Sequence, residues 1–343
     1  MNNIRSLASS VVSGALSGTH LTAEEKAFLA REAHPGVTLF SRNLTPESRE
    51  GSDHRALSTL IAQVQSLRTG TAPLLISIDQ EGGRVARLKG AILDPGPAQL
   101  LAQGKIDSAG LEEIRICAYA MGQKLREIGL TCNFAPCLDI LTKSENTAIG
   151  NRVFGTTAEG VALRGDAFLQ GLQQSGILGC LKHFPGQGDA QVDTHAGSAV
   201  ISASPEQLWA RELVPFRHCL SSAPMVMVAH CIYSAIDSRE ATRSVLIMED
   251  LLRKKLGFSG VIVSDDMRMG AVAGEINAWC EYLCESIAAG VDLLLVCEGL
   301  EHWSTAIDVL EKEALRSTVF QRRLREASAR VLSLRGKISQ PGS

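Results

Sequence analysis

Apolar and polar positions divide the chain into short apolar runs that alternate with amphipathic segments. The apolar runs have the length and composition of buried strands. They cover residues 11–16, 36–41, 73–79, 131–139, 176–184, 224–230, 260–266 and 291–297. Several are apolar almost without interruption, which is typical of parallel strands that are covered on both faces.

The segments between these runs carry apolar residues at helical spacing. This spacing predicts helices near residues 57–67, 114–128, 161–172, 205–220, 300–312 and 318–335. Gly129 is expected to cap the second helix at its C-terminus, and Pro215 is expected to break the fourth. Residues from about 337 to 343 are expected to form a disordered tail.

Strands that alternate with helices over nearly the whole chain predict an α/β protein. The expected fold is a (β/α)8 barrel of the TIM type, with residues 1–343 as a single catalytic domain. A doubly wound sheet is the alternative, and it needs a glycine-rich turn after its first strand. The one candidate, "GQGDAQ" at 186–191, lacks the third glycine and does not open a helix.

Length and charge exclude several classes of partner. The chain has 343 residues and a net charge of -3, so we expect no nucleic-acid partner. No apolar run approaches the ~18 residues that a membrane-spanning helix needs, so we expect no membrane partner. The N-terminal "MNNIRSLASSVVSGALSG" is interpreted as the region of the first strand, with a weak signal peptide as the alternative.

Nine cysteines are scattered through apolar runs, and none forms a Cys-x-x-Cys pair. An odd number of core cysteines favours reduced thiols in a cytoplasm over a framework of disulfides. Their spacing does not support a zinc site, so no metal is expected.

Ionisable residues follow the apolar runs at the point where each predicted strand ends. They are Asp79, Asp139, the pair Lys182 and His183, His230, and the pair Asp265 and Asp266. The carboxyl ends of barrel strands converge on one face, where active sites of this fold lie. The sequence therefore predicts a pocket that gathers several carboxylates and histidines.

A stretch of about twenty residues between Phe184 and Ser204 lacks clear secondary structure, and connections that long are often functional. It contains "KHFPGQGDAQVDTH", in which Gly186 and Gly188 allow a turn. Asp193 and His195 are spaced so that the carboxylate can orient the imidazole as a proton shuttle. A solvated loop with incidental charges remains the alternative at this point.

Three further choices stay open on spacing alone. Strand alternation places Asp265 and Asp266 on opposite faces without showing which enters the pocket. Lys182 either binds a ligand or pairs with a buried carboxylate such as Asp79, or does both. Loop arginines suit hydrogen bonding to hydroxyl, amide or carboxylate oxygens, or else lie at the surface; they are Arg84, Arg87 and Arg152.

Motifs for a serine nucleophile elbow, a P-loop and an H-E-x-x-H metal site are missing. The residues alone thus indicate a barrel enzyme with an aspartate-rich pocket and a histidine-bearing loop. Hydrolysis or group transfer at a polyol is the class of reaction that this combination favours.

Six motifs occur together in a recognisable order: "ISIDQEGGRVARL", "NFAPCLDI", "AIGNRVFG", "LKHFPGQGDAQVDTH", "MVAHCIYSAID" and "GFSGVIVSDDMRMGAV". On these motifs the chain resembles family 3 of the glycoside hydrolases. It is most similar to the single-domain bacterial β-N-acetylglucosaminidases (β-hexosaminidases) of peptidoglycan recycling. The resemblance covers roughly residues 10–300.

The resemblance implies a role for each matching residue. Asp265 would be the nucleophile of a retaining mechanism, His195 the general acid/base and Asp193 its partner. The sugar-binding residues would be Asp79, Arg87, Arg152, Lys182 and His183. The family further implies a cytoplasmic enzyme with a small carbohydrate substrate, a GlcNAc-containing muropeptide. It implies no cofactor and no metal, and a monomer is favoured.

The chain departs from the family pattern around the predicted acid/base. Gln187 stands where the family often has histidine, and "THAG" after the dyad is also unusual. We expect altered loop packing there without loss of activity. Other activities to distinguish are a phosphorylase that uses the same dyad, a β-glucosidase, a metal-dependent hydrolase and a non-catalytic sugar-binding barrel.

Overall fold

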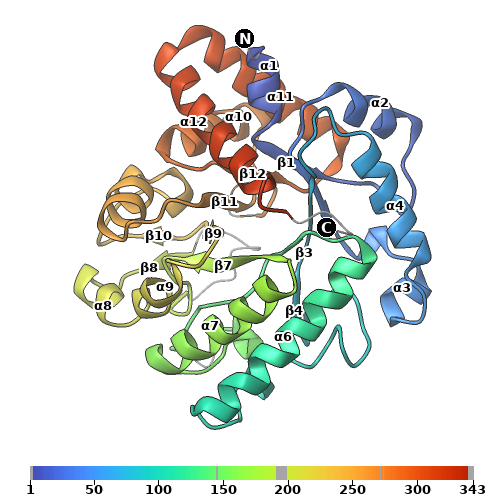
Figure 1. Ribbon diagram of the computed structural model, residues 1–343. Coiled ribbons are helices and arrows are strands. Elements are labelled where there is room, and N and C mark those ends of the chain that lie inside the picture. Colours follow the sequence, from blue (N-terminus) through green and yellow to red (C-terminus); the bar gives the residue numbers. More distant parts are fainter. Residues whose placement is uncertain (1–2, 144–145, 191–198, 271, 273, 339–343) are drawn as a thin grey trace.

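The computed structural model describes residues 3–143, 146–190, 199–270, 272 and 274–338. Parallel strands close a barrel in the order β1-β12-β11-β9-β7-β6-β3-β2, and the barrel lies at the centre of Figure 1. The barrel strands are β1 (Val12–Ala15), β2 (Gly36–Leu39), β3 (Leu75–Ile78), β6 (Cys132–Asn133), β7 (Leu178–Phe184), β9 (Met225–Val228), β11 (Val261–Asp266) and β12 (Leu293–Val296). Each predicted apolar run contains one of them, so the (β/α)8 prediction is confirmed.

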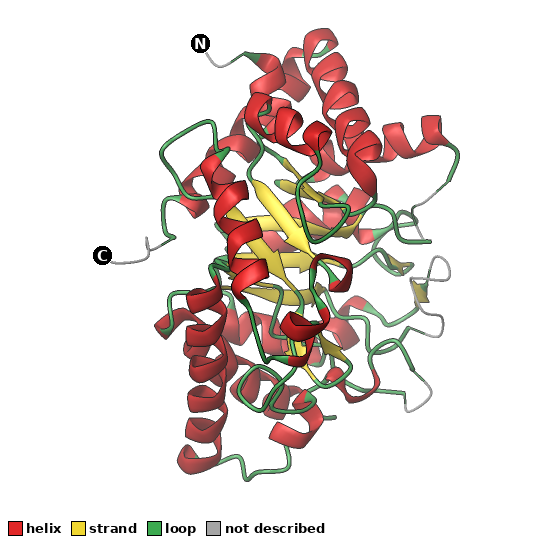
Figure 2. Cartoon of the chain, turned by 90° about the vertical axis from the view of Figure 1, so that its right-hand side faces the viewer, coloured by secondary structure: helices red, strands yellow, loops and turns green. Residues whose placement is uncertain are grey.

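Helices flank the barrel strands in both views (Figures 1 and 2). The α-helices are α1 (Ile4–Ser9), α2 (Ala23–Arg31), α3 (Pro46–Glu50), α4 (Arg55–Ser66), α5 (Ala98–Leu101), α6 (Ser108–Ile128), α7 (Ala158–Gln174), α8 (Pro205–Ala210), α9 (Leu213–Cys219), α10 (Ile276–Ala289), α11 (Gly299–Arg316) and α12 (Thr318–Arg335). Short 3-10 helices are η1 (Ser41–Asn43), η2 (Gly150–Arg152) and η3 (Ala241–Arg243), and η4 (Leu246–Lys255) is a π-helix. The sequence pattern did not single out α2, η4 or α10.

Side chains of the barrel strands alternate between two apolar clusters. Val261 and Val263 lie in the barrel interior, whereas Ile262 between them packs outward against helices. Both faces of the strands are therefore buried, which explains why the runs read as continuously apolar. Helix α12 closes the amino-terminal end of the barrel, where Ile338 joins the interior cluster. Ile338 is thus buried, although it falls in the segment we expected to be disordered.

The break in the fourth predicted helix lies upstream of the proline. Helix α8 ends at Ala210 and α9 begins at Leu213, so Pro215 lies in the first turn of α9. A proline is tolerated there because the first backbone N–H groups of a helix have no intrahelical acceptor. Gly129 caps α6 in the left-handed conformation, as predicted.

The N-terminal segment belongs to the barrel, as the interpretation as a first strand predicted. Strand β1 pairs in parallel with β12 and with β2. Among the described residues, no helix combines the length and apolar character that crossing a bilayer requires.

Candidate active site

Two small sheets extend the barrel beyond the carboxyl ends of its strands. Strand β4 (Gln80–Gly82) follows β3 after a single residue and pairs with β5 (Val85–Ala86). Strand β8 (Val200–Ile201) pairs with β10 (Ile232–Tyr233). The side chain of Asn133 fixes the start of β4 because it hydrogen bonds both the N–H (2.9 Å) and the carbonyl (2.8 Å) of Gln80.

A buried chain of ion pairs links the ends of β3, β4 and β7. Lys182 donates to Oδ1 of Asp79 at 2.8 Å, and its Nζ lies 2.6 Å from Oε1 of Glu81. Arg152 binds the same Glu81 through two hydrogen bonds of 2.9 and 2.7 Å. The pairing of Lys182 with Asp79 that we left open is confirmed. Glu81, which bridges the two cations, was missed in the sequence.

The chain of contacts continues to the end of β6. Nη2 of Arg152 lies 3.3 Å from Nε2 of His183, and Nδ1 of His183 lies 2.6 Å from Oδ2 of Asp139. The other oxygen of Asp139 accepts the backbone N–H of Gln187 at 2.8 Å. Lys182 and His183 therefore both reach the same network, although they are adjacent in the chain.

Opposite charges keep these groups ionised in spite of burial. Burial by itself would raise the pKa values of Asp79 and Asp139. Lys182 and Arg87 outweigh this effect at Asp79, and His183 outweighs it at Asp139, so both pKa values lie below the usual range. Glu81 is shifted further in the same direction by Arg152 and Lys182, which hold its pKa well below normal. Burial opposes the charge of Lys182, but Asp79 and Glu81 raise its pKa above the ordinary value.

The loop arginines differ in what they do. Arg87 reaches Oδ2 of Asp79 at 3.4 Å, and its guanidinium lies 5.8 Å from the centre of the Phe40 ring. Its buried Nε has no hydrogen-bond partner within the described part of the chain. Arg84 is exposed and donates to the backbone carbonyls of Thr147 and Ala148. Arg84 thus holds the loop that carries Arg152 and lies outside the ion network.

The two aspartates at the end of β11 have different surroundings. A β-bulge between Val263 and Asp266 interrupts the alternation on which the sequence argument relied. Asp266 accepts the backbone N–H groups of Arg268 and Cys297, both at 3.1 Å, and burial raises its pKa. Both backbone groups donate to Oδ1, so the backbone holds this carboxylate through one of its two oxygens.

Asp265 is half-buried and accepts the N–H of Asp266 at 2.8 Å. Burial raises the pKa values of three thiols, Cys180, Cys231 and Cys297, and the charge of Asp265 adds to each shift. These cysteines belong to β7, to the loop after β9 and to the end of β12. The charge of Asp265 is therefore close enough to influence residues of several strands, which places it at the carboxyl end of the barrel.

His230, at the end of β9, lies beside this carboxylate. Its Nδ1 lies 2.9 Å from the hydroxyl of Thr242, and its Nε2 lies 3.3 Å from the carbonyl of Asp266. Burial lowers its pKa, and Asp265 opposes that shift only in part. His230 is consequently neutral at neutral pH and packs against β11.

The loop after β7 is fixed up to Asp189. Tyr233 donates to the carbonyl of Gly186 at 2.8 Å, and Arg211 pairs with Asp189 at 2.6 Å. Gly186 has a φ of 120°, and a Cβ at Gly188 would lie 1.7 Å from a backbone oxygen, so both positions require glycine. Asp193 and His195, the predicted dyad, lie outside the described residues.

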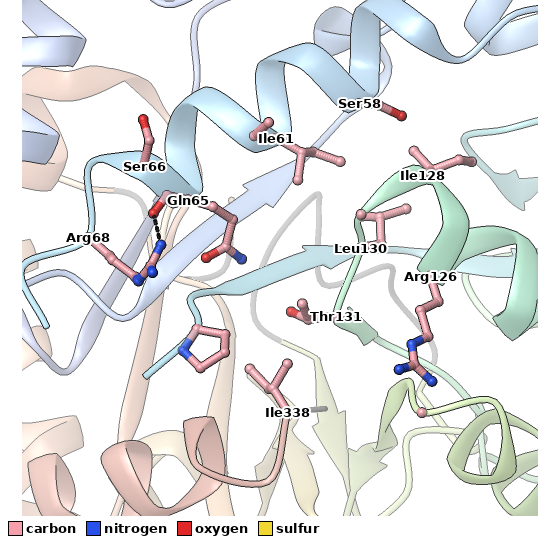
Figure 3. Close-up of a pocket in the computed structure, with 14 residues that line it drawn as sticks. Ser58, Ile61, Gln65, Ser66, Arg68, Arg126, Ile128, Leu130, Thr131 and Ile338 are labelled. Atoms are coloured by element: carbon pink, nitrogen blue, oxygen red, sulfur yellow. Dashed lines mark hydrogen bonds between the residues drawn. The ribbon is translucent and has the colours of Figure 1, made fainter. Parts of the chain in front are cut away.

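A hollow at the amino-terminal end of the barrel lies away from these strand ends. Figure 3 shows Ile61 and Ile128 from α4 and α6 lining it together with Leu130, Thr131 and Ile338. No carboxylate or imidazole belongs to the described residues that line it. The ionisable cluster at the strand ends is thus the candidate active site.

Comparisons with known proteins find relatives over most of the chain. The sequence profile described as "Glycosyl hydrolase family 3 N terminal domain" matches residues 4–334. A protein of Methylococcus capsulatus named "Beta-hexosaminidase" is 35% identical over 301 residues, which are 86% of this chain and 85% of that protein. A protein of the same name from Pseudomonas aeruginosa is 32% identical and is matched over 87% of this chain and 85% of its own length.

Solved structures with the same fold include an enzyme named for its activity and a protein in complex with a sugar derivative. A family 3 β-N-acetylglucosaminidase of Paenibacillus sp. matches with a TM-score of 0.89 and 31% identity over 100% of this chain, which spans 64% of that protein. NagZ of Neisseria gonorrhoeae, in complex with N-trifluoroacetyl-D-glucosamine, matches with a TM-score of 0.75 and 29% identity, over 94% of this chain and 97% of its own.

Proposed function

This chain belongs to glycosyl hydrolase family 3 and is a glycoside hydrolase, and from this premise we propose that it is a retaining β-N-acetylglucosaminidase. The observation that carries the proposal is the gathering of Asp79, Lys182, Arg152 and His183 at the strand ends where Asp265 lies. Relatives named for hexosaminidase activity support the choice of sugar.

The proposed reaction has two steps through a covalent intermediate. A carboxylate oxygen of Asp265 attacks the anomeric carbon while His195 donates a proton to the departing glycosidic oxygen. His195 then removes a proton from water, which attacks the same carbon and releases Asp265. Two displacements at one carbon retain its configuration. Asp193 would orient the imidazole and stabilise its charged form.

The ion network supplies the proposed sugar-binding surface. Asp79 and Arg87 remain partly exposed, with side chains 19% and 27% accessible, so they can hydrogen bond to hydroxyl groups of the sugar. Lys182 and Glu81 behind them are 2% and 4% accessible and hold that surface rigid. Because opposite charges already compensate within the network, it offers oriented donors and acceptors without a large net charge.

The substrate that we propose is a peptidoglycan-derived muropeptide with terminal β-linked N-acetylglucosamine. A cytoplasmic place in peptidoglycan recycling would suit it, and the presence of all nine cysteines as free thiols supports that location. The proposed reaction uses neither a cofactor nor a metal.

An assay with matched aryl glycosides tests the proposal. The enzyme should hydrolyse an aryl β-N-acetylglucosaminide much faster than the aryl β-glucoside, and proton NMR should show the β-anomer as the first product. Stimulation of turnover by inorganic phosphate would instead identify a phosphorylase. Loss of activity with a strong chelator would identify a metal-dependent hydrolase. Binding of amino sugars without cleavage would contradict an enzymatic role.

A further inference from the structure

Three side chains of different donor chemistry meet between the ends of β6 and β7. Cys137, Asp139 and His183 each place a ligand atom within 4.8 Å of the other two. Sγ of Cys137 lies 3.3 Å from Oδ2 of Asp139, and Nδ1 of His183 lies 2.6 Å from the same oxygen. The three residues are 2%, 0% and 4% exposed, so protein packing fixes their positions.

We infer that Cys137, Asp139 and His183 form a binding site for a zinc ion that competes with the sugar. A thiolate, an imidazole nitrogen and a carboxylate oxygen are the donor set that zinc takes in proteins, with a fourth position left for water. This site could not be recognised in the sequence, because Cys137 and His183 are far apart in the chain and the pairing of β6 with β7 brings them together.

Zinc binding at this site requires two proton movements. Burial and the nearby Asp139 raise the pKa of Cys137, so its thiol is protonated before the metal binds. The thiol then releases this proton to solvent as the sulfur–zinc bond forms. His183 must present a lone pair at Nδ1, so its ring proton resides on Nε2. The hydrogen bond between Asp139 and His183 is replaced by one bond from each residue to the metal.

The same rearrangement would disturb the sugar-binding network. With its proton on Nε2, His183 presents an N–H donor to Nη2 of Arg152, which lies 3.3 Å away. A guanidinium has no acceptor, so no hydrogen bond can form between the two groups. Arg152 would have to turn away from His183. Zinc would therefore inhibit the proposed hydrolase without touching Asp265. The inhibition rests on the proposed function, whereas the metal site does not.

Metal binding is measured on the Asp265→Asn variant, which lacks the proposed nucleophile. Binding is thereby measured separately from catalysis. Cobalt(II) reports on the ligands by absorption: a sulfur-to-cobalt charge-transfer band in the near ultraviolet and intense visible bands indicate a thiolate in a tetrahedral site. Zinc is then titrated by calorimetry and should bind with a stoichiometry of one and displace the cobalt signal.

Cys137→Ser in the same background keeps a polar atom beside Asp139 and should weaken zinc affinity by roughly 100-fold or more, since even the loss of an outer partner costs 10–100-fold. Cys219→Ser is the matched control, since Cys219 is also buried, and its sulfur donates to the carbonyl of Ala162 within the apolar core. It should bind zinc as the parent does.

Several results would overturn the inference. One is cobalt binding to the Asp265→Asn parent without the charge-transfer band, a result that requires no substitution among the three metal ligands. Another is equal zinc affinity in Cys137→Ser and its parent, with thermal melts confirming that both are folded. A zinc-binding enzyme that shows no β-N-acetylglucosaminidase activity would leave the site standing and refute the proposed function.

Discussion

Replacing Glu81 with glutamine should damage both stability and catalysis. Glu81→Gln keeps the shape of the side chain but removes the charge that faces Arg152 and Lys182 at 2.6 to 2.9 Å. Breaking one partner out of a buried ion pair costs about 3–5 kcal/mol, because the remaining charge is left uncompensated. Unfolding a chain of this length carries an entropy of about 0.7 kcal/mol per kelvin, so the melting temperature should fall by roughly 4–7 °C.

Catalysis should fall as well, because glutamine offers Arg152 one acceptor oxygen in place of two, so the guanidinium is held less firmly toward His183. Displacing a substrate-positioning group by about 1 Å can cost on the order of 100-fold in rate, so a loss of that size in kcat/KM is expected. The assays are a thermal melt and steady-state hydrolysis of an aryl β-N-acetylglucosaminide.

Glu112→Gln is the matched control. Glu112 also pairs with an arginine, Arg115, but on the exposed surface of α6, so its neutralisation should leave the melting temperature and kcat/KM unchanged. If Glu81→Gln melted together with the wild type and kept its kcat/KM, Glu81 would not be the bridge between the two cations.

Two further predictions concern the scaffold. Gly14→Ala should destabilise the protein by at least about 1–3 kcal/mol, because the added Cβ would lie 2.1 Å from the Trp303 ring. Gly18→Ala, with nothing within 4 Å, should change stability little, and denaturant unfolding compares the two. Burial lowers the pKa of His34 from 6.5 to about 4, so the unfolded chain binds a proton in that interval that the folded chain does not. Stability should therefore decline as pH falls from 6.5 to about 4, and His34→Leu should flatten this part of a urea-unfolding series; an unchanged slope would show that His34 is not the titrating group.

The barrel could be predicted because its strands are buried on both faces and therefore stand out as apolar runs. Strand β1 was harder to recognise, since Gly14 interrupts its apolar run. The structure explains the glycine, because the ring of Trp303 packs against this position and leaves no room for a Cβ. The π-helix over 246–255 and helix α10 were missed, although their apolar stripes are about as regular as those of α7 and α12, which were predicted.

The candidate site was predictable wherever a charged residue stands at the end of an apolar run in the sequence. This rule placed Asp79, Asp139, Lys182 and His183 correctly, because parallel strands bring their carboxyl ends together. It could not find Glu81, which lies in β4 past the end of β3, where Asn133 holds the preceding Gln80. It also could not choose between Asp265 and Asp266, because a bulge breaks the alternation there.

The central claim is that Asp265 forms the covalent bond to the sugar, and trapping the intermediate tests it most directly. The enzyme is incubated with a 5-fluoro derivative of an N-acetylglucosaminyl fluoride, digested, and its labelled peptide is sequenced by mass spectrometry. The account predicts one sugar per chain, attached to Asp265, with Asp265→Asn unlabelled. A label on Asp266 or elsewhere, or turnover of the reagent with inversion and no label, would contradict it.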